Sequence, residues 1–137
     1  MRKLDQRGAA AFEFCVVAMT IFALIFGIFD LGRYAITMQS LRSLAGAGAR
    51  AAMLDDCYMN TVLKITTTPT CSGDYTTEAQ KRALVPFLYA NGGSPTVTTV
   101  TGGSAITVTA SASFTTSFRT IWGSTFDNPS TTAKIPF

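Results

Sequence analysis

The sequence predicts an α+β protein in which one long N-terminal helix precedes a small domain. Two observations lead to this fold class. An apolar run of helix length lies near the N-terminus, at residues 9–29. Apolar and polar residues alternate strictly at 106–115, which is typical of a half-buried antiparallel strand. The chain has 137 residues, of which only 14% are charged, which is material for one domain.

The apolar run contains 21 residues and is interrupted only by Glu13. A helix of that length is roughly 31 Å long, close to the hydrocarbon thickness of a bilayer. A cleavable secretory signal and a buried core helix are the alternatives. Small residues should follow a cleavable signal, but Asp30 and Arg33 follow here. The remaining chain is too short and too polar to enclose a core helix, so the run predicts a membrane-spanning helix.

The flanking charges predict an orientation. Arg2, Lys3 and Arg7 precede the run, which favours a cytoplasmic N-terminus and an exported C-terminal part. Residues 1–8 hold three of the 11 basic and one of the eight acidic residues, so the remainder is nearly neutral. No basic footprint is left for a nucleic-acid partner.

Helical periodicity continues beyond the run as far as Met53. The apolar positions of this amphipathic extension are Leu31, Tyr34, Met38, Leu41, Ala45 and Ala52. Its small residues at 45–52 favour two interpretations equally: a seam for another helix, or a close fit under the protein's own sheet. The predicted organisation is therefore a basic leader at 1–8, a transmembrane part at 9–29, an amphipathic extension at 30–53 and an exported α+β domain at 54–137.

In the exported domain the sequence predicts one short helix and about three antiparallel strands. Thr77 and Gln80 have the spacing of a capping box, which opens a helix that runs to Leu88 and that Pro86 can kink. The strands are expected at 96–101, 106–115 and 131–135, with Gly102 and Gly103 in the turn between the first two. The aromatic residues Phe118, Trp122 and Phe126 are expected in a connecting loop, as core plugs rather than a recognition surface.

Cys57 and Cys71 flank 13 residues of the exported part. An oxidising compartment permits a disulfide between them, and we favour it over two free thiols. A zinc site is improbable because the chain has no His. Cys15 lies in the apolar run and is expected to behave as a small hydrophobic residue.

The residue types argue against catalysis. The absence of His removes the commonest general base and the commonest metal ligand. No nucleophile with its base, phosphate-binding loop or isolated pair of acids is visible, and Asp55 and Asp56 fit a solvated helix end. We therefore expect no enzyme activity, no cofactor, no metal and no small-molecule substrate.

The surroundings of Glu13 carry a family resemblance. The stretch from Gly8 through Glu13 to Phe14, reading GAAAFEF, resembles the class III signal of type IV pilins, with the Gly-x-x-x-x-Glu-Phe/Tyr processing site of the tight-adherence (Flp) pilus system. Residues 26–33, FGIFDLGR, resemble a segment of TadE-like pseudopilins, with Asp30, Gly32 and Arg33 where the helix leaves the apolar run. Residues 45–52 and 132–135 resemble the later parts of those proteins.

The resemblance implies a type IV pilin-like fold and a non-catalytic minor pilin or pseudopilin of the cytoplasmic membrane, in a system of adhesion and biofilm formation. It implies that a prepilin peptidase cuts between Gly8 and Ala9, next to Glu13 and Phe14. Glu13, then the fifth residue, would pair with the N-terminal amine of a neighbouring subunit. The implied partners are the membrane, the peptidase, other pilins and the assembly platform.

A plain anchor is the alternative: a membrane-anchored exported binding or adhesion module that is not incorporated in a fibre. Cleavage after Gly8 discriminates between the two, because an anchor would keep an intact N-terminus. The sequence does not separate a TadE-like from a TadF-like role.

Overall fold

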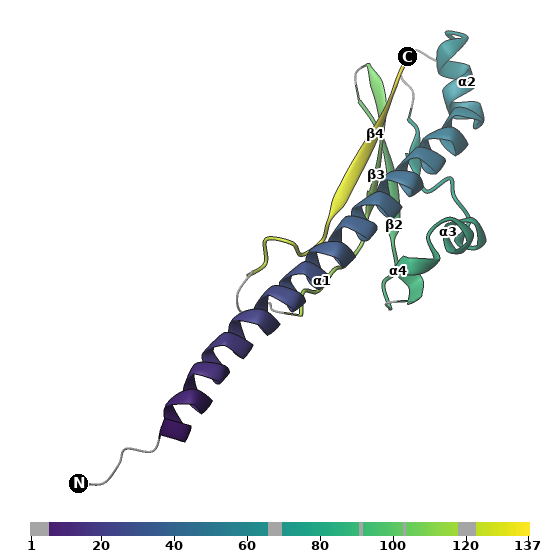
Figure 1. The fold of residues 1–137 in the computed structure, drawn as a ribbon. Coiled ribbons are helices and arrows are strands. Elements are labelled where there is room, and N and C mark those ends of the chain that lie inside the picture. Colours follow the sequence, from purple (N-terminus) through teal and green to yellow (C-terminus); the bar gives the residue numbers. More distant parts are fainter. Residues whose placement is uncertain (1–5, 66–69, 91, 103, 118–122) are drawn as a thin grey trace.

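The computed structural model describes residues 6–65, 70–90, 92–102, 104–117 and 123–137, and for residues 6 and 7 it describes the backbone only. The elements in chain order are α1 (Gln6–Met53), α2 (Asp56–Val62), β1 (Ser72–Gly73), α3 (Glu78–Leu84), α4 (Pro86–Ala90), β2 (Thr96–Thr101), β3 (Ala105–Ser111) and β4 (Ser130–Pro136). Helix α1 crosses the whole molecule, its N-terminal half projects alone, and its C-terminal half carries the sheet (Figure 1). The expected α+β fold class, a long apolar helix before a small antiparallel domain, is confirmed.

The sheet has four antiparallel strands in the order β1-β2-β3-β4. The expectation of three strands missed β1, whose Ser72 pairs with Val100. A strand of two residues is too short to show a period, which is why it escaped prediction. The predicted strand at 106–115 was too long, because β3 ends at Ser111 and the next amide, that of Ala112, donates to the carbonyl of Pro129.

The core lies between the inner face of the sheet and the C-terminal half of α1. Its largest fully buried side chains are Leu41, Leu44, Val85, Ile106, Val108 and Ile135. Leu31 was expected on the buried helix face but is 48% exposed, because the core cluster begins only at Leu41. The amphipathic extension is therefore covered by the sheet over its later turns.

The sequence left open whether the small residues of α1 form a seam for another helix or fit under the protein's own sheet, and individual positions differ in this respect. Ala45, Gly48, Ala49 and Ala52 are buried against the domain's own elements. A Cβ at Gly48 would lie 3.1 Å from Val108 Cγ1 and 3.2 Å from Val97 Cγ1. A Cβ built on the neighbouring glycine, Gly46, would meet nothing within 4 Å. The sheet thus requires a small residue at 48 and leaves position 46 open.

Three short helices follow α1, where the sequence predicted one. Asp55 caps α2, accepting a 3.0 Å hydrogen bond from the amide of Cys57, so the acidic pair begins a new helix rather than ending the old one. The capping box of α3 forms as expected, with Thr77 N donating to Gln80 Oε1 and Gln80 N to Thr77 Oγ1. Pro86 divides the expected helix into α3 and α4, because the residue before a proline is disfavoured in the helical region.

Helix α1 also begins earlier than expected. Its first residue is Gln6 rather than Ala9, so the last residues of the predicted basic leader are already helical. Of the three loop aromatics, Phe126 packs against α1 at Tyr34. The predictions for Phe118, Trp122 and the turn residue Gly103 lie outside the described residues.

Candidate functional site along the N-terminal helix

Residues 9–29 of α1, here called the apolar span, are exposed along their whole length. Only Ala18 and Gly27 are partly covered. The helix is long and apolar enough to cross a membrane, and only 6% of an 18-residue apolar stretch of it is buried. A core helix of a soluble domain would be mostly buried. One N-terminal helix of this kind suits single-pass anchoring in a membrane.

The predicted processing residues lie on the first three turns of α1. Gly8, Ala9, Glu13 and Phe14 are all exposed, and Phe14 retains 72% of its surface. A Cβ at Gly8 would meet nothing within 4 Å, so there is room for a side chain. Alanine would also favour the helix by roughly 1 kcal/mol relative to glycine. The fold therefore places no demand for glycine at position 8.

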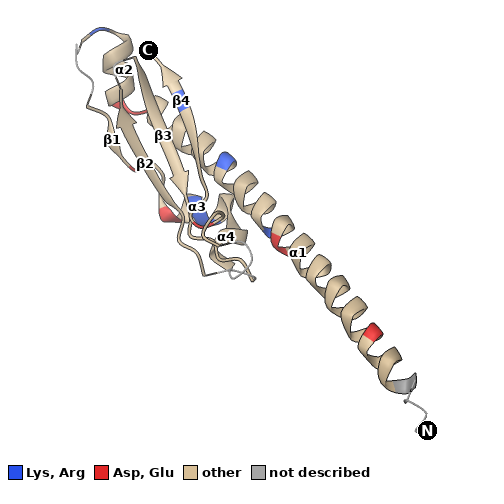
Figure 2. Cartoon of the chain, turned by 90° about the vertical axis from the view of Figure 1, so that its left-hand side faces the viewer, with Lys and Arg blue, Asp and Glu red and all other residues tan. Residues whose placement is uncertain are grey.

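Glu13 is the only charged residue between Gly8 and Phe29. Its carboxylate is exposed on the span and forms no ion pair within the described part of the chain. Figure 2 shows how sparse charged positions are along the projecting part of α1. A carboxylate within an apolar segment costs on the order of 2.5–3.5 kcal/mol at the centre of a bilayer and less near its surface. A Glu13 carboxylate without an ion pair would therefore bear part of that cost inside a bilayer.

Asp30 marks the point where the sheet domain first touches α1. Asp30 and Arg33 are three residues apart and could pair across one exposed helical turn, but the Asp30 carboxylate is only 3% exposed. Its Oδ2 atom accepts a 2.9 Å hydrogen bond from the backbone amide of Ser117, 87 residues away in sequence. Arg33 Nη1 lies 3.9 Å from Asp30 Oδ1. Asp30 therefore anchors the segment after β3 to the helix, besides facing Arg33.

Aromatic contacts surround this anchor. The Arg33 guanidinium lies over the ring of Phe114, 5.5 Å from its centre. The Tyr34 ring meets Phe114 and Phe126 edge-on, at 5.6 and 5.0 Å between ring centres. Tyr34, one helical turn after Asp30, was not predicted as part of this site, although the spacing of four residues placed it on the same helix face. Together these contacts hold the domain against the helix directly above the apolar span.

Gly32, the third residue of the predicted exit motif, takes no part in these contacts. It is exposed, and a Cβ there would meet nothing within 4 Å. The structure thus brings Asp30 and Arg33 together and leaves Gly32, like Gly8, on the open side of α1.

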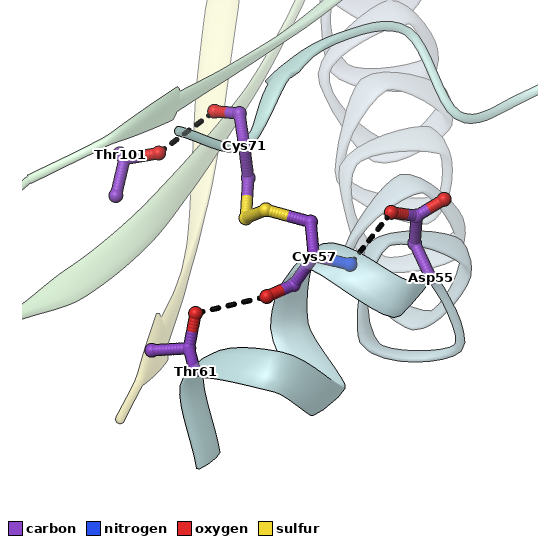
Figure 3. The surroundings of a disulfide bond; sticks show 5 residues. All are labelled: Asp55, Cys57, Thr61, Cys71 and Thr101. Carbon is purple, nitrogen blue, oxygen red and sulfur yellow. Dashed lines mark hydrogen bonds between the residues drawn. A yellow bond between two sulfur atoms is a disulfide. The ribbon is translucent and has the colours of Figure 1, made fainter. Parts of the chain in front are cut away.

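Cys57 and Cys71 are joined by a disulfide that ties α2 to the start of the sheet (Figure 3). Hydrogen bonds fix both half-cystines: Thr61 Oγ1 donates to the Cys57 carbonyl and Thr101 Oγ1 to the Cys71 carbonyl, each at 2.8 Å. The bridge lies at the end of α1 far from the apolar span. Cys15 is a free, exposed thiol on the span.

The titratable groups that gather elsewhere serve to join short elements. Lys81, whose side chain is 7% exposed, contacts Asp74 Oδ2 at 2.5 Å and Glu78 Oε1 at 2.7 Å, and Tyr89 donates to Glu78 Oε2. Burial by itself would raise the pKa of the Asp74 carboxyl, but hydrogen bonds from Lys81 and Thr76 outweigh burial and lower that pKa. In the same way, burial would lower the pKa of the Lys81 ammonium, and its two carboxylate partners raise it instead.

These groups form a compact ion network between the loop before α3 and the helices α3 and α4. Across the residues that the structure describes, no group of three or more Cys, Asp or Glu side chains could hold a metal ion. What the arrangement offers chemically is anchoring, charge pairing and packing.

Comparison with known proteins gives one match. Residues 8–50 match the model of a family described as TadE-like protein. No curated protein and no solved structure matches the chain. The matched residues run from the glycine before the apolar span to the last turn of α1. Over most of α1 the chain is thus similar to TadE-like proteins.

Proposed function

We propose that the protein is a non-catalytic minor pilin or pseudopilin that takes part in assembly of tight-adherence pili. One observation carries the proposal. An exposed apolar helix half bears a single carboxylate, Glu13, five residues after a glycine that the fold does not need, in a TadE-like segment. A residue that the fold does not require is best explained by recognition outside the fold.

The proposed recognition at Gly8 is cleavage. A prepilin peptidase would cut between Gly8 and Ala9, because a chain with no side chain before the scissile bond and small ones after it fits a narrow membrane-embedded cleft. The flanking charges support an N-terminus in the cytoplasm and a C-terminal domain beyond the cytoplasmic membrane. The Cys57–Cys71 disulfide supports the same side for the domain, since oxidising compartments preserve such bonds.

Glu13 is proposed to set the register of assembly. The new α-amine at Ala9 would be an ammonium, and an ammonium and a carboxylate buried together relieve each other, whereas either alone is costly. We place the amine on a neighbouring pilin subunit. The proposed partners are thus the peptidase, other pilins and the assembly platform, and the proposed setting is surface adhesion and biofilm formation.

Two measurements test the proposal in the native host. N-terminal analysis of the membrane-extracted protein should find Ala9 as the first residue. Glu13→Ala and Glu13→Gln should leave membrane insertion unchanged but reduce co-purification with pilus components, whereas Gln39→Ala, another exposed polar residue of α1, should not. An intact Met1 N-terminus together with unchanged co-purification of the Glu13 variants would favour the plain membrane anchor and refute the proposal.

A further inference from the structure

A cavity of about 250 Å³ lies between the sheet domain and α1. Its walls include Arg33 and Thr37 of α1, Gly92 and Gly93 of the turn after α4, and residues 113–115, which follow β3. Figure 1 shows α4 beside α1 at the end of the domain that is nearest the apolar span. We call this space the juxtamembrane cavity, because it lies close to the point where α1 leaves the span.

Two glycines keep one wall of the juxtamembrane cavity free of side chains. Gly92 has a φ of +73°, a backbone conformation that favours glycine. A Cβ at Gly93 would lie only 3.0 Å from the carbonyl oxygen of Leu88. The turn therefore favours glycine at both positions, and space remains where side chains would otherwise stand. Pockets that enclose whole drug-sized ligands measure about 300–1,000 Å³, so this smaller space suits a headgroup rather than a whole lipid.

Arg33 is the one charged side chain among the described residues that line the cavity. Its guanidinium lies over the Phe114 ring, 5.5 Å from the ring centre, and this contact orients the plane of the group. Asp30 Oδ1 is 3.9 Å from Arg33 Nη1, beyond hydrogen-bond distance, and the Arg33 side chain is 28% exposed. Most of the five N–H donors of the guanidinium therefore remain for a ligand. A planar fork of this kind matches two oxygens of a phosphate.

The position of Arg33 along α1 indicates the source of the phosphate. Arg33 is four residues beyond Phe29, the last residue of the apolar span, which is about 6 Å at 1.5 Å per residue. The headgroup region of a bilayer adds roughly 5–7 Å to each side of the hydrocarbon core. With the span in the bilayer, the guanidinium is therefore at the depth of the lipid phosphates.

The uncharged part of the lining distinguishes between headgroups. Ser113 and Thr115 are exposed, and their hydroxyl groups have no hydrogen-bond partner among the described residues. No Asp or Glu of the described chain lines the cavity, so an ammonium headgroup would find no carboxylate there. A glycerol headgroup would find two hydroxyl partners. We propose that the cavity binds the phosphodiester of an anionic phospholipid with a hydroxylated headgroup, such as phosphatidylglycerol, in the leaflet from which the domain emerges.

This site depends on anchoring by the apolar span and not on cleavage or pilus assembly, so its test is independent of the proposed function. The full chain in non-ionic detergent micelles is titrated with phosphatidylglycerol or with phosphatidylethanolamine of the same acyl chains, and bound lipid is counted by native mass spectrometry. We expect one phosphatidylglycerol per chain, bound about tenfold more tightly than phosphatidylethanolamine. Equal affinity for the two lipids would overturn the proposal.

A matched pair of arginine variants locates the site. Arg33→Gln should weaken binding of phosphatidylglycerol about tenfold, because hydrogen bonds to a charged group are lost. Arg42→Gln removes another exposed arginine of α1, nine residues further from the span, and should leave binding unchanged. Equal weakening by the two substitutions would mean attraction to surface charge alone and would overturn the site.

A second set of variants leaves Arg33 in place, since Arg33 also faces Asp30. Ser113→Ala with Thr115→Val should reduce the preference for phosphatidylglycerol over phosphatidylethanolamine about threefold, the effect of losing neutral hydrogen bonds. Circular dichroism of each variant checks that its helix and sheet are retained. An unchanged preference in the folded double variant would overturn the choice of headgroup.

Soluble phosphates distinguish a lipid from a free ligand. Inorganic phosphate and glycerol 1-phosphate, each added in excess, should leave phosphatidylglycerol bound, because the lipid shares the micelle with the protein and has a high local concentration there. Displacement of the lipid by either compound at the lipid's own concentration would show that the cavity takes a soluble phosphate and would overturn the assignment to a lipid.

Discussion

Two glycines of α1, two residues apart, should respond in opposite ways to the same substitution. Gly46 and Gly48 both lie inside the helix, where alanine is favoured over glycine by roughly 1 kcal/mol. A methyl group at 46 would meet nothing within 4 Å, whereas one at 48 would press on Val108 and Val97 at 3.1 and 3.2 Å. The comparison therefore isolates what the sheet requires of the helix.

The expected magnitudes follow from these two terms. Gly46→Ala should raise the free energy of unfolding by about 0.5–1 kcal/mol, from helix propensity alone. Gly48→Ala gains the same propensity, but overpacking of a filled core costs about 1–3 kcal/mol. Val97 and Val108 are β-branched and are held in place by their strand neighbours. We therefore expect the overpacking cost to exceed the gain in helix propensity. The Gly48 variant should then be less stable than the Gly46 variant by about 1–3 kcal/mol.

The assay is urea unfolding of the full chain in non-ionic detergent micelles, followed by circular dichroism with the disulfide intact. The midpoints of the two variants should lie on opposite sides of the midpoint of the unaltered protein, with a common slope. Equal stabilisation by both substitutions would refute the reasoning, because it would mean that the sheet does not lie on α1 at Gly48. The detergent-solubilised monomer is used so that contacts between copies at Gly46 do not enter the result.

Three further predictions concern the disulfide, the helix anchor and the ion network. Replacing Cys57 and Cys71 by Ser should lower the free energy of unfolding by about 3 kcal/mol, the loop-closure value for a loop of about 15 residues, measured by urea unfolding with and without reductant; equal stabilities would contradict it. Asp30→Ala should cost about 1–3 kcal/mol and speed hydrogen exchange at the Ser117 amide, which would lose its buried acceptor; an unchanged exchange rate would rule out the anchor. The pKa of Asp74 is lowered from its ordinary 3.8, so its contribution to stability is complete above pH 3.8 and is lost as the pH falls through the lower folded value. The urea midpoint should therefore fall between pH 5 and pH 3, about the range of that titration, and it should fall further in the unaltered protein than in Asp74→Asn. If the midpoints of the two proteins fall in parallel with pH, the pairing of Asp74 with Lys81 is refuted.

The sequence predicted the helices and strands wherever a pattern was long enough to repeat. The apolar run and its amphipathic continuation extend over many turns, so α1 was predicted nearly to its ends. The alternation at 106–115 located β3 because each residue faces either the core or the solvent. Short elements carry no such signal. Strand β1 has two residues. Helix α2 has seven, and Asp55, which caps its N-terminus, was predicted to lie at a solvated helix end.

Residues of the candidate site were predictable to different degrees. Glu13 was singled out because a carboxylate inside an apolar run is costly, and Gly8 because the stretch that begins with it resembles a pilin processing site. The environment of Asp30 was not, because its partner Ser117 is 87 residues away and sequence shows only its neighbour Arg33. Tyr34 was assigned to the buried face for its apolarity, but its contact with Phe126 depends on where the loop before β4 passes.

The sequence by itself thus determined the local and periodic properties of this protein: a helix apolar enough to span a membrane, the single charge on it, and an alternating strand. Tertiary structure alone decided which small residues face the sheet. Gly46 and Gly48 are equivalent in sequence, yet only one lies under Val108 and Val97. It also decided that Asp30 is buried and that the apolar residues around α2 stay exposed. The physical reason is that burial depends on what another segment places against a residue, which no local pattern records.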